Sequence, residues 1–337
     1  MKEKDYNLEI IRNISFLSVI IIHVANYYCR AFDKIPQNEY IFSLILDTLA
    51  RVSVPCFFMI SGALLLGRDE PLKKHWHRLI RFLIPFIVWS IIYYFWNIYY
   101  LKEPQLFREI LYFPITEHLW YLYAIIPIYI VLPFFQIMCR HMSLKTERAF
   151  LIIITITVIF NYILSLDELK PYYDLPLIGD RVYSYYFFIG YYIYKYKKHI
   201  PINQKNLIIT FLGSMAITAF LTASISYSIG DHYEEILEYG NPLIILASAA
   251  FFLFVLRLAK YKITPSIKTK KIIDLLSGCS FGIYLIHIIF LDIYKNHMQA
   301  ADLSAWIAIP MLTITIAIIS FVCVWLLRHF KLGRKIT

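Results

Sequence analysis

Residues 8–29 read LEIIRNISFLSVIIIHVANYYC. This mostly apolar run is long enough to cross the hydrocarbon core of a bilayer as one α-helix. It carries Arg12 in its interior and lacks a small-residue cleavage pattern, and both features are atypical of a secretory signal peptide. We therefore expect this run to stay in the mature protein as a membrane-spanning helix.

The rest of the chain repeats this pattern. Of its 337 residues 59% are hydrophobic and 17% are charged, and the mean hydropathy is +0.60. These values are too apolar for a protein whose whole surface meets water. The apolar runs predict an all-α integral membrane protein with about ten transmembrane helices in a single domain, residues 1–337. The predicted spans are residues 8–29, 40–66, 78–100, 119–138, 149–166, 181–194, 207–228, 242–258, 272–293 and 304–328.

The distribution of Lys and Arg predicts the orientation of these helices. Of 33 such residues, 24 lie in one set of alternate loops and six in the other. The positive-inside rule places the richer set, with both termini, in the cytoplasm. This distribution explains the net charge of +10. The sequence has no stripe of basic residues interleaved with residues that could contact bases, so nucleic-acid binding is not indicated. Three arginines remain in or at the edge of predicted spans: Arg12, Arg51 and Arg181.

Arg12 and His23 share one face of the first predicted helix. Eleven residues at 100° each return to within about 20° of the same direction and separate the two by roughly 16 Å. In the predicted orientation Arg12 lies in the inner third of the membrane and His23 in the outer third, with Asn26 one turn beyond. Taken alone, His23 is equally compatible with a hydrogen-bonded core histidine.

Other predicted spans place polar residues at the same outer depth. Arg51 follows Asp47 by four residues, a spacing that allows an ion pair. Ser280, Tyr284 and His287 form a polar stripe, which interhelical hydrogen bonding alone could explain. Because ionisable groups facing lipid are costly, we expect a shared water-accessible cavity. The residues assigned to it are Asn26, Arg51, His118, Trp120, Arg181, Ser280, Tyr284 and His287.

Arg78 and Arg81 lie one helical turn apart at the start of the third predicted span. They could serve only to hold this loop in the cytoplasm. Two guanidinium groups on one face could also bind phosphates in bidentate fashion, which suits a nucleotide-containing donor such as coenzyme A. Walker, GxGxxG, HExxH, GxSxG and CxxC patterns are missing, so neither ATP-driven nor metal chemistry is predicted.

Five segments resemble the acyltransferase 3 family of membrane-bound acyltransferases. They occur in the family's order and extend over nearly the whole chain. They are RNISFLSVIIIH (12–23), RVSVPCFFMISG (51–62), RLIR (78–81), HLWYLY (118–123) and SFGIYLIH (280–287).

This resemblance implies a ten-helix core that takes an acyl group, usually acetyl, from cytoplasmic acyl-CoA. The acceptor would be a hydroxyl of an envelope glycan or glycolipid, and the protein would lie in the bacterial inner membrane. By the same resemblance His23 and Arg12 are the catalytic residues, and Arg78 and Arg81 bind acyl-CoA. No metal is expected, and the oligomeric state is not predicted.

Two other functions are compatible with polar groups at membrane depth. A transporter or flippase of a small polar substrate would use them to line its pathway. A purely structural or sensory membrane protein would use them as a packing network.

Overall fold

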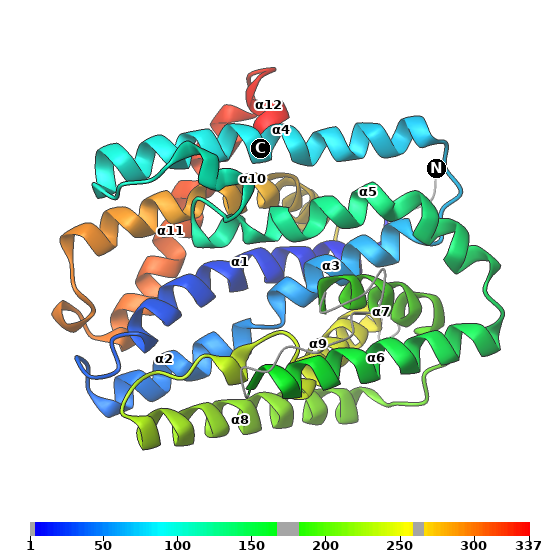
Figure 1. The fold of residues 1–337 in the computed structure, drawn as a ribbon, viewed down its shortest axis with the longest axis horizontal. Coiled ribbons are helices and arrows are strands. Elements are labelled where there is room, and N and C mark those ends of the chain that lie inside the picture. Colours follow the sequence, from blue (N-terminus) through cyan, green and yellow to red (C-terminus); the bar gives the residue numbers. More distant parts are fainter. Residues whose placement is uncertain (1–3, 167–181, 259–265) are drawn as a thin grey trace.

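The computed structural model describes residues 4–166, 182–258 and 266–337 (Figure 1). Within these ranges every regular element is a helix, as predicted. The α-helices are α1 (Tyr6–Cys29), α2 (Gln37–Ala50), α3 (Ser53–Leu65), α4 (Leu72–Trp96), α5 (Trp120–His141), α6 (Leu144–Leu166), α7 (Val182–Tyr196), α8 (Gln204–Ile229), α9 (Pro242–Leu256), α10 (Ile267–His297), α11 (Ala305–Leu327) and α12 (Gly333–Ile336). Single turns of π- or 3₁₀-helix are η1 (Asn97–Leu101), η2 (Phe107–Leu111), η3 (Glu117–Leu119), η4 (Glu235–Leu237) and η6 (Ala300–Asp302).

Nine segments of the described ranges are long and apolar enough to cross a membrane. They correspond to nine of the ten predicted spans, so a multi-pass membrane protein is confirmed. Their orientation relative to the cytoplasm stays a prediction. The nine are Tyr6–Cys29, Gln37–Leu65, Leu72–Leu101, Glu117–His141, Leu144–Leu166, Gln204–Ile229, Glu235–Leu256, Ile267–His297 and Ala305–Leu327.

The sixth predicted span, residues 181–194, corresponds to α7. This helix has 15 residues and is about 22 Å long, shorter than a hydrocarbon core of about 30 Å. Most of its side chains are buried inside the bundle. The Tyr186 hydroxyl donates a hydrogen bond to the Tyr239 carbonyl at 2.7 Å. α7 is therefore a short internal helix, and its crossing of the membrane stays a prediction.

The second predicted span, residues 40–66, is confirmed as the apolar segment Gln37–Leu65, but a short turn divides this segment into two helices. α2 ends at Ala50 and α3 begins at Ser53. Pro55 has no backbone N–H, and its ring clashes with the carbonyl four residues earlier, which belongs to Arg51. The helix therefore stops and restarts with Pro55 in the first turn of α3. The third and ninth predicted spans also begin too late, because α4 starts at residue 72 and α10 at residue 267.

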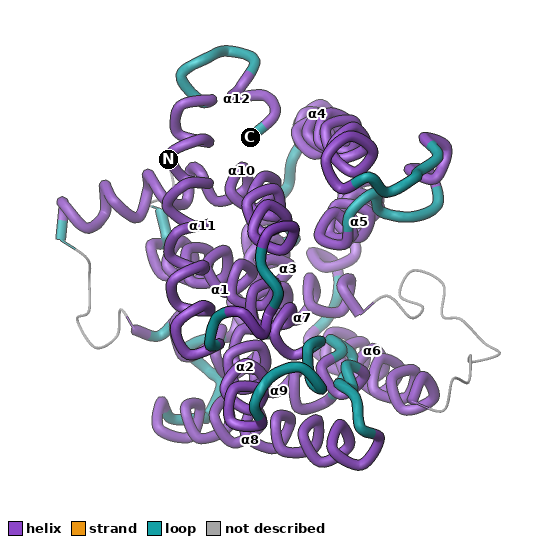
Figure 2. Tube along the Cα trace, turned by 90° about the vertical axis from the view of Figure 1, so that its left-hand side faces the viewer, coloured by secondary structure: helices purple, strands orange, loops and turns teal. Residues whose placement is uncertain are grey.

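α1 runs through the middle of the bundle and contacts α2, α3, α10 and α11 (Figures 1 and 2). α4 and α5 lie together on one side of it, and α6 and α8 on the other. α6 and α8 are the least buried of the spans and expose large apolar side chains such as Ile156 and Phe220. These surfaces suit contact with lipid, whose hydrocarbon is as apolar as the side chains.

α3 and α7 pack with their backbones in close contact. A Cβ atom on Gly62 would lie 1.7 Å from the carbonyl oxygen of Phe187, and one on Gly190 would lie 2.2 Å from the Cα atom of Met59. Only glycine fits either position. Small residues permit this close approach between membrane helices.

Candidate active site

A cavity of about 1220 Å³ lies inside the bundle and follows one face of α1. Along this face it is lined by Arg12, Val19, His23, Asn26 and, just beyond the helix, Arg30. The 18 residue steps from Arg12 to Arg30 correspond to about 27 Å along a helix axis. Because the hydrocarbon core is about 30 Å thick, the cavity extends over most of a membrane's depth.

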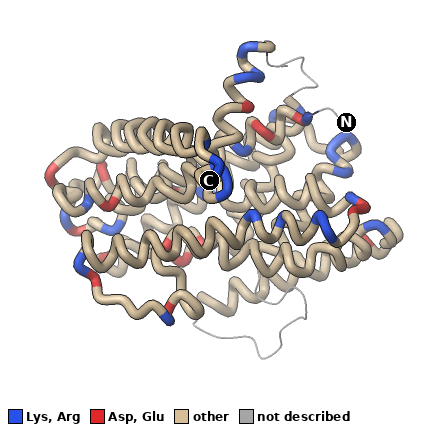
Figure 3. The backbone as a smooth tube through the Cα atoms, turned by 90° about the horizontal axis from the view of Figure 1, so that it is seen from above, with Lys and Arg blue, Asp and Glu red and all other residues tan. Residues whose placement is uncertain are grey.

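One end of this cavity, the basic end, is lined by several cations. The predicted pair Arg78 and Arg81 lines it from the start of α4. Further cations come from the segment before α4 and from the segment after α11. In Figure 3, Lys and Arg are prominent around the C terminus. The lining cations of the basic end are Arg68, Arg78, Arg81, Arg328, Arg334 and Lys335.

Arg78 has an anionic partner within the protein. Glu70 forms ion pairs with Arg78 and, at 3.3 Å, with Arg68. The Glu70 side chain is 10% exposed. The hydrogen bond from Arg78 lowers the pKa of Glu70, while burial opposes this effect. A phosphate arriving at the basic end must therefore share Arg78 with Glu70 or replace it.

The segment after α11 folds back beside α4 (Figure 1). The Trp89 indole N–H donates a hydrogen bond to the Ile336 carbonyl at 2.8 Å. Gly282 of α10 permits the approach, because a Cβ there would lie 2.9 Å from the Cβ of Thr337. This fold-back brings the last cations of the chain into the cavity wall.

Three imidazoles meet farther along the cavity. The ring centroid of His23 lies 5.2 Å from that of His287 and 6.4 Å from that of His118, and the latter two are 5.3 Å apart. His287 Nδ1 donates to the Tyr284 carbonyl at 2.7 Å, which leaves its Nε2 with a lone pair. That Nε2 is buried without a hydrogen-bond partner among the described residues. His23 and His118 line the cavity, whereas His287, predicted to line it, packs against their rings.

Arg12 lines the cavity between the basic end and the histidines. It pairs at 2.5 Å with Glu9, one turn earlier on α1. The roughly 16 Å of helix between Arg12 and His23 prevents both from touching the same reacting atom. Arg12 and His23 therefore face different stretches of the cavity.

The other end of the cavity, the acidic end, is lined by the carboxylates of Glu117, Glu234 and Glu238. Arg30 Nε lies 2.8 Å from Glu234 Oε1, and Arg30 Nη1 lies 3.1 Å from Glu117. Asn26 donates a further hydrogen bond to Glu234 at 2.9 Å. Burial raises the pKa of Glu234, but these hydrogen bonds from Arg30 and Asn26 outweigh it and lower the pKa to about 2. Glu234 is thus held as a carboxylate.

Arg51 lines the cavity next to the break between α2 and α3. Its Nε and Nη2 atoms donate to the two carboxylate oxygens of Asp47 at 3.0 and 2.8 Å. Asp47 is fully buried. The ion pair that the spacing allows is therefore present, and it holds the guanidinium against the cavity wall.

Aromatic rings complete the wall near the acidic end. The Trp120 ring lies 4.8 Å from that of Tyr183 and 6.0 Å from that of Tyr239, measured between centroids. Ser280 and Tyr284 line the cavity from α10. The Tyr284 hydroxyl donates to the carbonyl of His118, which ties α10 to η3.

A family model for an acyltransferase domain, acyltransferase 3, matches residues 5–329. The chain belongs to the acyltransferase 3 family. The match covers nearly the whole chain and confirms the resemblance found in the sequence. No curated protein and no solved structure matches this acyltransferase.

The acyltransferase brings ten of its predicted site residues into one cavity. His287 packs behind two of them, and Arg181 lies outside the described residues. The ten are Arg12, His23, Asn26, Arg51, Arg78, Arg81, His118, Trp120, Ser280 and Tyr284.

Several residues in or behind the cavity wall of the acyltransferase cannot be recognised as site residues from the sequence alone. Tyr183 and Tyr239 are two of 28 tyrosines, and nothing in their spacing distinguishes them from an aromatic belt. Arg334 and Lys335 look like orientation signals. Glu70 does not line the cavity but pairs with Arg78, which does, and it follows a span without any motif. Their roles depend on contacts between segments that are far apart in the chain.

Proposed function

We propose that this protein transfers an acyl group, acetyl being the simplest, from acyl-CoA to a hydroxyl of an envelope saccharide or lipid-linked saccharide. The observation that carries the proposal is the single cavity that joins the basic end, the histidines and the acidic end. By the positive-inside rule the basic end faces the cytoplasm, where acyl-CoA is found. The expected location is the bacterial inner membrane.

The basic end suits the phosphates of coenzyme A. Guanidinium groups bind phosphate oxygens through paired, charge-assisted hydrogen bonds, and Arg78 and Arg81 face the cavity from adjacent turns of α4. The pantetheine arm then extends past Arg12 toward His23. The volume of about 1220 Å³ exceeds the usual 300–1,000 Å³ of small-molecule sites, so donor and acceptor can be held together.

The acidic end suits a saccharide. Carboxylates such as Glu234 accept hydrogen bonds from sugar hydroxyls, and the rings of Trp120 and Tyr183 offer flat apolar surfaces for the C–H faces of a sugar. An acceptor arriving from this end reaches the histidines from the side opposite to the donor. The two substrates therefore meet near His23.

The reaction is a single transfer with general base catalysis. A neutral His23 imidazole takes the proton of the acceptor hydroxyl, and the oxygen attacks the thioester carbonyl carbon. The tetrahedral intermediate collapses, the C–S bond breaks, and the coenzyme A thiolate receives the proton from the imidazolium. Arg51 and His118 line the cavity as hydrogen-bond donors for the developing oxyanion.

Transport of a small polar substrate is the second candidate. Two observations favour it: the cavity extends over most of the membrane's depth, and the span that contains Arg51 is broken, as spans at transporter sites often are. A transporter moves its substrate without releasing coenzyme A. Product formation therefore separates the two functions.

The test uses the purified protein in nanodiscs with acetyl-CoA and a panel of envelope saccharides. Free coenzyme A thiol and acetylated saccharide are both measured. His23→Gln should lower the rate by about 10²–10⁴-fold and leave acetyl-CoA-induced thermal stabilisation in place. His329→Gln, an exposed histidine that does not line the cavity, should behave like wild type.

A wild-type rate for His23→Gln would remove the proposed base. If wild-type protein in proteoliposomes moves a saccharide across the membrane and releases no coenzyme A, the protein is a transporter.

A further inference from the structure

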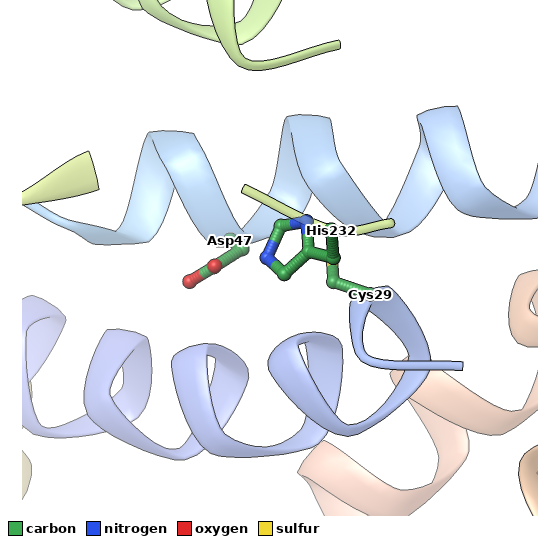
Figure 4. Close-up of side chains that lie close together, drawn as sticks. All are labelled: Cys29, Asp47 and His232. Carbon is green, nitrogen blue, oxygen red and sulfur yellow. The ribbon is translucent and has the colours of Figure 1, made fainter. Parts of the chain in front are cut away.

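Cys29, Asp47 and His232 form a cluster beside the acidic end, outside the residues that line the cavity (Figure 4). Cys29 is the last residue of α1, Asp47 lies in α2, and His232 lies in the segment between α8 and η4. Each residue offers one atom that can ligate a metal, and these three atoms lie within 4.8 Å of one another. Three separate segments thus bring a sulfur, an oxygen and a nitrogen atom to one point.

The cluster is buried, and one of its atoms lacks a partner. Cys29 and Asp47 are fully buried, and the His232 side chain is 2% exposed. His232 Nδ1 lies 3.0 Å from the Tyr40 hydroxyl. His232 Nε2 has no hydrogen-bond partner among the described residues, and its distance of 3.8 Å to Glu234 Oε1 is too long for one. Because buried polar atoms are nearly always paired, this nitrogen is available to bind a ligand.

We propose that Cys29, Asp47 and His232 bind one Zn²⁺ ion. Thiolate, carboxylate and imidazole are the ligands that zinc takes in proteins, and three protein ligands leave the fourth tetrahedral position open. The sulfur disfavours Mg²⁺ and Ca²⁺, which take oxygen ligands. The proposal replaces the expectation from sequence that no metal is bound, because none of the three residues belongs to a spacing motif.

The surrounding hydrogen bonds are compatible with this ion. When His232 Nδ1–H donates to the Tyr40 hydroxyl, Nε2 keeps the lone pair that the metal needs. Asp47 accepts two hydrogen bonds from Arg51, and a carboxylate retains further lone pairs for a metal. Ligand atoms around tetrahedral zinc are roughly 3.3–3.8 Å apart, so binding draws the three side chains closer by about 1 Å.

The ligands offset most of the charge. Binding releases the thiol proton of Cys29 to solvent. The thiolate and the Asp47 carboxylate then supply two negative charges against the two positive charges of the ion and the one of Arg51, which lowers the cost of burying the ion.

The position of the ion gives it a structural task. It would join the segment that carries His232 to the ends of α1 and α2. The connection from α8 to α9, which includes this segment, supplies Glu234, Glu238 and Tyr239 to the cavity wall. The metal would therefore hold the acidic end in shape, and its binding does not depend on acyl transfer.

The test titrates Co²⁺ into the purified full-length protein in detergent after removal of metals with EDTA. Wild type should bind one equivalent with a thiolate-to-cobalt charge-transfer band, and one equivalent of Zn²⁺ should displace it. Cys29→Ser should lose the band. Tyr40→Phe should weaken Co²⁺ binding by about tenfold, because a group that orients a ligand typically contributes 10–100-fold to metal affinity.

Cys323→Ser is the matched control, because Cys323 belongs to no such cluster in the part of the chain that the structure describes. It should bind Co²⁺ like wild type. A wild-type titration without the band, or an unchanged band in Cys29→Ser, would overturn the proposal. If Cys29→Ser does not fold, His232→Gln provides the same test from outside the helices: it should bind Co²⁺ at least about 10-fold more weakly, and wild-type affinity there would also overturn the proposal.

Discussion

Replacing Glu70 with glutamine should tighten the binding of acetyl-CoA. Glu70 is ion-paired with Arg78, and the two side chains are 10% and 19% exposed. At about 4 Å and an effective dielectric constant near 20, the attraction between two such charges is about 4 kcal/mol before solvation is counted. Measured pairs with some solvent access retain up to about 1 kcal/mol of net stabilisation. In Glu70→Gln the donor phosphate no longer competes with a carboxylate for Arg78. Its binding free energy should therefore improve by about 1 kcal/mol, which lowers the Kd about fivefold.

The assay is a calorimetric titration of acetyl-CoA into the purified protein in detergent. Asp69→Asn is the matched control, because it removes the same charge at the adjacent position. The Asp69 side chain is 82% exposed and pairs at 2.6 Å with Arg140, which does not line the cavity. The Kd of Asp69→Asn for acetyl-CoA should stay within about twofold of the wild-type value. If Glu70→Gln binds no more tightly than Asp69→Asn, the assignment of Arg78 to the donor phosphates is refuted.

Three further predictions concern other parts of the molecule. The double variant Arg334→Gln/Lys335→Gln should weaken acetyl-CoA binding by about tenfold in the same titration, because two partly exposed charge contacts together contribute about 1.4 kcal/mol; an unchanged Kd would place the phosphates elsewhere. Gly62→Ala should destabilise the fold by about 1–3 kcal/mol through overpacking between α3 and α7. Its melting temperature should fall in detergent, whereas Gly213→Ala, with nothing within 4 Å of the new Cβ, should not lower it. Because the pKa of Glu234 in the fold is about 2, below its ordinary value of 4.5, its ionisation stabilises the fold fully above pH 4.5. This contribution should be lost as the pH falls from 4.5 toward 2, and melting curves of Glu234→Gln should show a weaker pH dependence over that window.

The membrane spans are the part of the fold that sequence predicts best. Nine of the ten predicted spans correspond to long apolar helices, because crossing hydrocarbon requires a minimum apolar length that any composition window detects. Two of the differences from the predicted spans have local causes. Pro55 interrupts the second span, and α7, with 15 residues, lies inside the bundle, where it is covered by neighbouring helices.

The candidate site is predictable only in part. His23 and Arg12 can be identified from the sequence because ionisable groups at membrane depth require an explanation. Arg78 and Arg81 can be identified because their spacing suits the binding of phosphate. Sequence spacing orders residues along one helix. It does not show which face of one helix meets which face of another.

The sequence by itself determined that this chain is a multi-pass membrane protein of the acyltransferase 3 family. Apolar length and the order of five segments are properties of the chain alone. Only the tertiary structure placed Arg334 at the basic end and brought Cys29 and Asp47 to His232. The physical reason is that lipid and neighbouring helices are equally apolar, so hydrophobicity does not select helix partners. Shape does, through close contacts such as those at Gly62.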